Sequence, residues 1–329
     1  MTQKLNLEKK NINFVSYIIT AFNKRKYVSK VINALVNEKG THKREYIVID
    51  DGSEDSTSLI FKNLSKKLPG KLKIIKRKNL GASYSTNQAV KEANGYWIRL
   101  LDGDDLVTYK STEIMLFLAK QKKVGFVYGL ISENINREYD ISYNYKLQSS
   151  YEGLMKFIKN CPANSSALLV SKEFYFKSGG CNENFVSPDQ VLFLRLFSSG
   201  PGVFLKKIVA KLPKSQSLDR LSSQISRSRY ESILALINFC SENSNTEKII
   251  LKKAFQRALS RANTYNKFLN NRYLSNHFFN YVLSKVIFPN NYKKYMYNSL
   301  KVFTGGKKHK PRNWYTGSEK MAISKKYIK

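Results

Sequence analysis

The chain has 329 residues, a length that suits one catalytic domain with an appendage better than two full domains. Its 57 Lys and Arg residues outnumber the 24 Asp and Glu residues, and the formal net charge of +33 predicts a polyanionic partner or surface. The three cysteines form no CxxC pair, which argues against a disulfide framework or a zinc ribbon. A reducing, cytoplasmic setting is therefore expected.

The sequence also bears on membrane contact. Residues 1–13 are polar and contain lysine, unlike a secretory signal. Apolar runs stay below the roughly 18 residues that a helix needs to span a bilayer. Any membrane association is therefore expected to be peripheral, on the inner face of the cytoplasmic membrane.

Short apolar runs alternate with helical patterns from residue 14 to residue 130. Ser53 is expected to cap the helix that follows the second strand. Strands that alternate with helices in this way predict βαβ units and an α/β fold, with a mostly parallel sheet flanked by helices. The strands are expected at 14–20, 46–49, 72–75, 96–101 and 124–130, and two of the helices at 82–93 and 112–120.

The remainder of the chain divides into a second block and a basic appendage. Residues 151–212 predict a strand at 167–170, a turn at Gly179-Gly180 and a helix that starts near Pro188. Beyond about residue 222 the pattern becomes helical and basic. We therefore expect a tail over 1–13, a catalytic domain over 14–220, a helical basic region over 221–304 and a basic tail over 305–329.

Phe and Tyr residues are interleaved with lysines in the helical basic region. One interpretation is a peripheral surface for an anionic membrane, because Lys and Arg attract anionic headgroups and aromatic rings settle at the interface. The alternative is that the aromatic rings form an ordinary core and the lysines form a solvated face.

Two of the predicted strands end in clusters of carboxylates, Asp50-Asp51-Gly52-Ser53 and Asp102-Gly103-Asp104-Asp105. In an open α/β sheet, ligands bind beyond the carboxyl ends of the strands, so the two clusters should share one crevice. Five carboxylates at close range repel one another, and a divalent cation such as Mn²⁺ or Mg²⁺ with a phosphorylated ligand would relieve that repulsion. We therefore expect a metal-assisted site for a nucleoside diphosphate; the alternative is two ordinary polar turns.

A third segment, Asn79-Leu80-Gly81-Ala82-Ser83, precedes the helix expected at 82–93. Small residues at the start of a helix allow its free N–H groups to face a ligand. The alternative is close packing of this helix on the sheet.

The order of these motifs resembles the family 2 glycosyltransferases of the GT-A fold. The likeness covers about residues 14–198 and includes Thr20-Ala21-Phe22-Asn23 after the first strand, where the family usually has Pro-Thr-Tyr-Asn. It implies a Rossmann-like GT-A domain over 14–220, with a nucleotide-sugar half (14–110) and an acceptor half (111–220). It also implies an inverting enzyme that moves a sugar from a nucleotide-diphosphate sugar to a hydroxyl of a cell-surface glycan or lipid-linked acceptor.

The resemblance implies a role for each motif residue. The residues expected to bind the nucleotide sugar are Thr20, Ala21, Phe22, Asn23, Asp50, Asp51, Asn79, Gly81, Asp102 and Gly103. Asp102 and Asp104 would form the DxD element that holds the divalent cation, with Asp105 in support. Asp189 matches the stretch in which family members carry the general base; the alternative is a first-turn carboxylate favoured by the helix dipole.

Two features depart from the family. The histidine that often lies near the metal has no match, because the histidines here are His42, His277 and His309. The Gln-x-x-Arg-Trp signature of processive synthases is missing, which favours the addition of a single sugar.

Other functions stay open. An inactive glycosyltransferase-like scaffold would fit the missing histidine. A nucleic-acid-binding protein would fit the net charge, but the strand-end carboxylates would repel phosphate without a metal, so no nucleic acid is expected as a partner.

Overall fold

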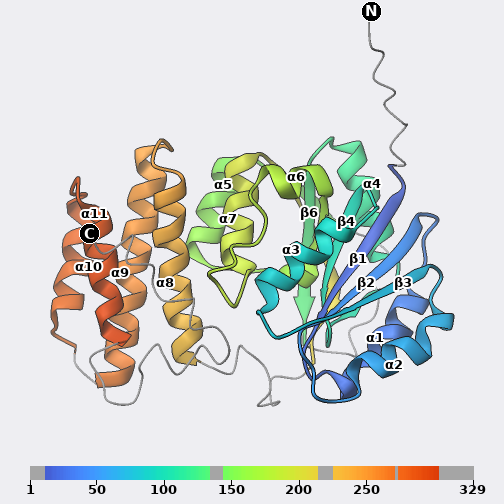
Figure 1. The fold of residues 1–329 in the computed structure, drawn as a ribbon. Helices are drawn as coiled ribbons and strands as arrows, with labels where there is room; N and C mark the ends of the chain where they lie inside the picture. The colour runs from blue at the N-terminus through green and yellow to red at the C-terminus, as the bar shows by residue number, and fades with distance from the viewer. Residues whose placement is uncertain (1–11, 134–143, 214–224, 271–272, 304–329) are drawn as a thin grey trace, which may run out of the picture.

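The structure is a computed structural model that describes residues 12–133, 144–213, 225–270 and 273–303. A sheet with helices against it forms one end of the molecule, and a group of helices forms the other end (Figure 1). The strands are β1 (Phe14–Ala21), β2 (Lys43–Asp50), β3 (Lys71–Lys76), β4 (Trp97–Asp102), β5 (Leu106–Val107), β6 (Phe126–Ser132), β7 (Tyr145–Gln148), β8 (Leu168–Ser171) and β9 (Gly202–Lys211).

The helices of the sheet domain are α1 (Arg25–Asn37), α2 (Thr57–Leu64), α3 (Ala82–Glu92), α4 (Ser111–Gln121), α5 (Ser150–Lys159), α6 (Lys172–Lys177) and α7 (Asp189–Ser199). The helices of the other end are α8 (Ile225–Glu242), α9 (Lys248–Asn270), α10 (Asn276–Val286) and α11 (Tyr292–Ser299). Short 3₁₀ turns occur at η1 (Ser65–Lys67), η2 (Ser165–Ala167) and η4 (Leu300–Phe303). In the described part of the chain, none of the helices is long and apolar enough to cross a membrane.

The nine strands form one sheet in the order β3-β2-β1-β4-β8-β6-β9-β5, with β7 also paired to β9. The strands β3, β2, β1, β4, β6 and β9 share one direction, and β8, β5 and β7 run against their neighbours. The α/β class and the mostly parallel sheet flanked by helices are confirmed. Apolar periodicity carries no information on strand direction, so the antiparallel β8 between β4 and β6 could not be predicted from it.

The register of the sheet brings three strand ends together. Thr20 at the end of β1 pairs with Asp102 of β4, and Ala21 pairs with Asp50 of β2. Beyond the strands, Gly103 N donates to Thr20 O at 2.8 Å, and Asp51 N donates to Ala21 O at 2.8 Å. The two carboxylate clusters therefore lie at one edge of the sheet, as the sequence predicts.

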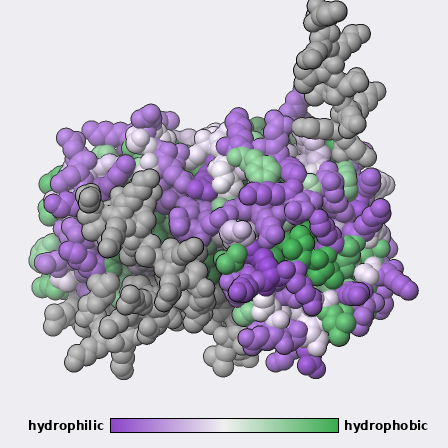
Figure 2. All heavy atoms as spheres, in the orientation of Figure 1, coloured by the Kyte–Doolittle hydropathy of each residue, from purple (hydrophilic) through white to green (hydrophobic). Residues whose placement is uncertain are grey.

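Apolar packing holds this edge in place. On α1, Val28, Val31, Ile32 and Leu35 recur at helical spacing and are all 0% exposed against the sheet core. Full burial of a side chain of this size contributes about 1.5–3 kcal/mol. On the face drawn in Figure 2, hydrophilic side chains cover most of the surface around this core.

The N-cap predicted at Ser53 is wrong. Helix α2 begins only at Thr57, with Ser56 at the N-cap position, and the Asp55 carboxylate accepts a hydrogen bond from Thr57 N at 2.9 Å. The loop is longer than expected because Ser53 is engaged elsewhere: its N–H donates to Asp50 Oδ1 at 2.9 Å, and its Oγ accepts from Asn23 N at 2.9 Å.

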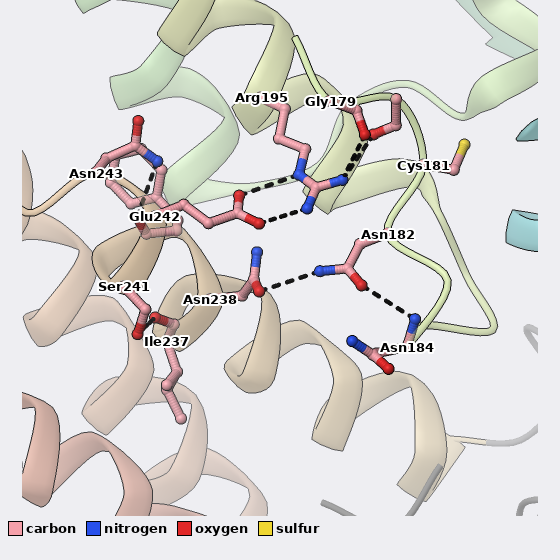
Figure 3. A network of polar contacts seen from close by, with 12 residues as sticks. Gly179, Cys181, Asn182, Asn184, Arg195, Ile237, Asn238, Ser241, Glu242 and Asn243 are labelled. Carbon is pink, nitrogen blue, oxygen red and sulfur yellow. Dashed lines mark hydrogen bonds and ion pairs between the residues drawn. The ribbon is translucent and has the colours of Figure 1, made fainter. Parts of the chain in front are cut away.

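Polar contacts fasten the C-terminal helices to the sheet domain (Figure 3). Arg195 of α7 donates to both carboxylate oxygens of Glu242 on α8, and its Nη1 donates to Gly179 O at 2.9 Å. Nearby, Asn182 Nδ2 donates to Asn238 Oδ1 at 3.1 Å. A two-pronged Arg–carboxylate pair fixes orientation as well as distance, so α8 is held in a defined position on α7. The domain boundary expected at 220 falls outside the described residues, as do the tail at 305–329 and most of the tail at 1–13.

Candidate active site

Three predicted acidic residues meet at one short turn before β8. Ser165 N donates to Asp189 Oδ1 at 2.8 Å, and the Ser165 hydroxyl donates to Asp102 Oδ1 at 3.5 Å, the upper limit for a hydrogen bond. Asn164 Nδ2 donates to Asp105 Oδ2 at 3.2 Å, and Ser166 Oγ accepts from Asp102 N at 2.9 Å. The turn thus joins the end of β4 to the start of α7.

Sequence reasoning missed this turn. Its residues belong to a short polar run after Pro162, a composition that many surface loops share. Its position was unpredictable because the turn reaches Asp102 only through the antiparallel pairing of β4 with β8. The one available signal was that polar side chains sit immediately before an apolar strand.

Burial raises the pKa values of two carboxyl groups at this site, and nearby negative charge adds to the effect for one of them. The pKa of Asp102 is raised well above its usual value, first by burial and then by the neighbouring carboxylates of Asp105, Asp189 and Asp104. Burial also raises the pKa of Asp189, against the opposing effect of hydrogen bonds from Ser165 and Ser187. Asp102 and Asp189 are half-buried residues.

A lysine contacts Asp104, the second carboxylate of the predicted DxD element. Lys24 lies directly before α1, and its Nζ is 2.6 Å from Asp104 Oδ2. Asp104 is 7% exposed, so this ion pair is largely shielded from water. The site therefore already contains one cation beside the predicted metal ligands, and sequence reasoning did not identify it.

The carboxylates that follow β2 are engaged within the protein. Asp50 accepts hydrogen bonds from Ser53 N and from the Ser58 hydroxyl. Asp51 accepts from Leu80 N at 3.0 Å and Gly81 N at 2.8 Å, and it pairs with Arg77 at 2.7 Å. These contacts hold the loop before α3 against the end of β2.

The remaining predicted binding residues lie around the same strand ends. Thr20 and Ala21 end β1, whereas Phe22, 44% exposed, and Asn23 project beyond it. Asn23 has a left-handed backbone, φ 52°, and its Oδ1 accepts from Glu54 N at 3.0 Å. The aromatic ring of Phe22 is thus open to solvent beside the carboxylates.

Two glycines allow the loops to approach closely. A Cβ at Gly103 would lie 2.9 Å from the Ala21 Cβ and 3.0 Å from Thr20 O. At Gly52, φ is +86° and a Cβ would lie 2.8 Å from Asn79 N, which places Asn79 directly against the Asp50-Asp51 turn. Side chains at either position would push the strand ends apart.

A buried arginine hydrogen-bonds to the backbone segments that carry the site. Arg99 of β4 is 0% exposed and donates to the carbonyl oxygens of Ser166, of Leu168 at 3.1 Å and of Val209 at 3.0 Å. These bonds connect β4, the 164–166 turn and β9. The apolar strand pattern gave no reason to expect a charged residue in the core.

The carboxylate oxygens at this site suit a divalent cation that the phosphates of a bound substrate also help to hold. In the described ranges, no group of three or more His, Cys, Asp or Glu side chains could hold a metal ion by itself. Mg²⁺-type sites commonly use one or two carboxylates together with substrate phosphates. Asp102 and Asp104 are the residues that would supply such a pair. Burial first, and then the neighbouring carboxylates, raises the pKa of Asp102, and a cation would offset that negative charge.

The described histidines do not extend this set. His42 lies in a buried network, with Nδ1 2.8 Å from Glu113 Oε2 and Nε2 3.0 Å from the Tyr17 hydroxyl. His277 lies on α10, and His309 falls outside the described residues. Both ring nitrogens of His42 are therefore occupied within the protein.

Known proteins with similar sequences include glycosyltransferases and glycan synthases. A chondroitin synthase of Escherichia coli is 26% identical over 203 residues, which make up 60% of this chain and 29% of the synthase. The matched segments cover less than two thirds of each relative's length. They cover 12% of the minor teichoic acid biosynthesis protein GgaB of Bacillus subtilis, 29% of the chondroitin synthase and 55% of the cholesterol galactosyltransferase of Borreliella burgdorferi.

Solved structures show the same fold. S. aureus TarS 1-349 in complex with UDP-GlcNAc has a TM-score of 0.64 at 18% identity, over 82% of this chain and 79% of that one. The mannosyltransferase PcManGT from Pyrobaculum calidifontis, in complex with GDP-Man and Mn²⁺, has a TM-score of 0.55 at 13% identity, over 91% and 82%. The expected GT-A fold with C-terminal helices is confirmed.

The family model called Glycosyl transferase family 2 matches residues 16–180, half of the chain. The match contains both carboxylate clusters and the 164–166 turn, and it ends before Asp189. The chain belongs to glycosyl transferase family 2.

Proposed function

We propose that the chain transfers one sugar from a nucleotide-diphosphate sugar to an acceptor hydroxyl of a bacterial cell-surface glycan, with inversion at the anomeric carbon. The observation that carries this proposal is the contact of Ser165 with both Asp102 and Asp189. It links Asp189, whose pKa is raised, to Asp102, the first carboxylate of the DxD element in this proposal. The relatives and structural neighbours support the substrate class, since their names include a chondroitin synthase and complexes with UDP-GlcNAc and GDP-Man.

In this proposal Asp189 is the general base. Its carboxylate takes the proton of the acceptor hydroxyl as that oxygen forms a bond to the anomeric carbon. The bond from that carbon to the diphosphate oxygen breaks, and the nucleoside diphosphate leaves with the bonding electron pair. One displacement inverts the configuration, so no covalent nucleophile on the protein is needed. The Ser165 N–H donates to Asp189 Oδ1 at 2.8 Å, which fixes the orientation of the carboxylate and so the position of its other oxygen, Oδ2.

Asp102 and Asp104 would hold Mn²⁺ or Mg²⁺ in this proposal. When bound, the cation would offset the charge that develops on the diphosphate leaving group. Lys24 at Asp104 lies at the same place and supplies a further positive charge for phosphate. Phe22 and Asn23 would face the nucleotide base, while Asp51 would act on the donor through the loop that it holds at Leu80 and Gly81.

The test is calorimetric titration of the purified chain with UDP, GDP, CDP and dTDP, each with and without Mn²⁺. We expect one nucleotide to bind, with an affinity that falls at least about tenfold when Mn²⁺ is withheld, because two carboxylates and a diphosphate share the cation. Asp104→Asn should lose the Mn²⁺ dependence while its circular dichroism stays unchanged. Glu183→Gln, which removes an exposed carboxylate outside the site, is the matched control. If a folded protein binds none of the four nucleotides, the proposal is wrong.

A further inference from the structure

One side of helix α10 has a stripe of apolar side chains that is exposed to solvent. Just beyond the carboxyl end of the helix, Ile287 extends this stripe and is 53% exposed. The spacing i, i+3, i+4, i+7 places its side chains on one side of the helix. We call this stripe the α10 face, and it consists of Phe279 (54% exposed), Val282 (42%), Leu283 (53%) and Val286 (81%).

The opposite side of α10 is the one that packs on the protein. Ser284 is 2% exposed, and its carbonyl oxygen accepts a hydrogen bond from Gln256 Nε2 of α9 at 3.0 Å. The orientation of α10 is therefore fixed with its more hydrophobic side outward. In Figure 2, hydrophobic side chains appear along the outer edge of this end of the molecule, where Figure 1 draws α10.

The stretch of sequence that contains α10 is basic. The sequence has no Asp or Glu between Glu247 and Glu319, whereas Lys and Arg recur throughout that stretch. Lys285 is exposed on α10 itself, with Nζ 5.0 Å from the centre of the Tyr281 ring. Lys267 of α9 lies 5.4 Å from the centre of the Tyr273 ring, just before α10. Long cationic side chains thus flank an exposed apolar stripe.

We propose that the α10 face docks the protein on an anionic lipid bilayer. An amphipathic helix that lies in the interface buries its apolar side at the boundary between headgroups and acyl chains. Flanking lysines then keep their charge among the anionic headgroups, each adding to the attraction. Exposed aromatic residues at the amino end of α10, Tyr273 at 68% and Phe279 at 54%, suit the same interface.

Charge distinguishes this partner from the protein alternatives. A second copy of the chain would bring two positively charged surfaces together, and like charges repel. The segment 304–329 is also basic, with Glu319 as its one acidic residue, and so offers no complementary charge. An anionic bilayer offers both apolar depth and negative charge at once.

Vesicle binding with a matched pair of leucine variants tests the proposal. Leu283→Glu alters the α10 face, and Leu59→Glu makes the same chemical change on α2, where Leu59 is 55% exposed. Wild type should bind vesicles of phosphatidylcholine with phosphatidylglycerol and bind phosphatidylcholine alone much more weakly. Leu283→Glu should lower the partition coefficient about tenfold or more, and Leu59→Glu about twofold or less, because only the first loses inserted apolar area.

A fluorescence measurement separates insertion from simple attraction between charges. Val286→Trp places a probe on the α10 face, and Leu59→Trp places one on α2. With phosphatidylglycerol vesicles, the emission of the first should shift to the blue and be quenched by brominated acyl chains, while the second stays unchanged. The native tryptophans are Trp97, which is 4% exposed, and Trp314, which lies outside the described residues, so the emission of wild type with the same vesicles is subtracted as background.

Three results would overturn the proposal. Equal loss of binding in Leu283→Glu and Leu59→Glu would mean that net charge alone drives binding. A dimer in sedimentation experiments that Leu283→Glu dissociates, without vesicle binding by wild type, would assign the α10 face to a second copy. If the full chain does not bind vesicles and binding appears only after removal of 305–329, this segment and not a bilayer covers the α10 face in the full chain.

Discussion

Asp189→Asn is the substitution that tests the assigned base most directly. Asparagine has nearly the same shape, and its Oδ1 can still accept the hydrogen bond from Ser165 N, 2.8 Å away in the wild type. The proton acceptor is lost while the geometry is kept. Loss of a general base lowers kcat by about 10²–10⁴-fold. At about 1.36 kcal/mol per tenfold change, that is roughly 2.7–5.4 kcal/mol of transition-state stabilisation.

The pKa of Asp189 sets the expected pH dependence. Burial raises this pKa, so in wild type kcat should rise with pH through a value above that of an ordinary aspartate. The Asn variant should lack this limb. A carboxyl whose pKa is raised on folding contributes stability at low pH, and that contribution is lost as pH rises through the folded-state pKa. Near neutral pH, Asp189→Asn should therefore be at least as stable as wild type.

The assay is initial-rate transfer from the nucleotide sugar that binds in calorimetry, with thermal unfolding of the same preparations. Nucleotide affinity should change by about twofold or less, since the asparagine keeps the hydrogen bond from Ser165 N and so leaves the contact of Ser165 with Asp102 in place. Glu183→Gln serves again as the control. If Asp189→Asn keeps kcat within tenfold of wild type, or keeps the pH limb, Asp189 is not the base.

Three further substitutions test the framework of the site. Gly103→Ala would bring a Cβ to 2.9 Å from the Ala21 Cβ, and urea unfolding should show a loss of about 1–3 kcal/mol; an unchanged midpoint would contradict the packing. Arg99→Met leaves buried carbonyl groups without their donor and should cost about 3–5 kcal/mol, whereas a loss below 1 kcal/mol would contradict its role. Glu231→Gln removes one of the two carboxylate oxygens that accept hydrogen bonds from Val186 N and Ser187 N. We expect kcat to fall about three- to thirtyfold while KM for the donor stays nearly constant. Equal changes in kcat and KM would instead mean general disruption of the site.

The sequence predicted the part of the site that local patterns can encode. Asp50-Asp51 and Asp102 lie at the ends of apolar runs. Strands that alternate with helices predict a parallel sheet, and parallel strands place their carboxyl ends together, so the meeting of these residues at one edge followed from local patterns. The Asp189 position was different: no pattern links it to β4. It was predicted from a family resemblance, and the structure brings it to Asp102 through the 164–166 turn.

What the sequence did not predict depends on contacts between distant residues. Lys24 reaches Asp104 across 80 positions, and Arg99 reaches Val209 across 110. Basic residues are common in this chain, so composition could not single out these two. Ser53 failed as a helix cap for the same reason, because its hydroxyl is occupied by Asn23 N from another loop.

The C-terminal helices have a part in the site as well as in the proposed lipid contact. Glu231 of α8 accepts from Ser187 N at 2.9 Å, and Arg261 of α9 donates to Gln190 Oε1 at 3.1 Å. These two contacts lie on either side of Asp189 along the chain, so the start of α7 is held by helices that the sequence assigned to an appendage. Burial lowers the pKa of Arg261 to about 10, which still leaves it charged at neutral pH and able to hold Gln190. Helix α9 thus contacts both α10, through Gln256 and Ser284, and the start of α7, through Arg261 and Gln190.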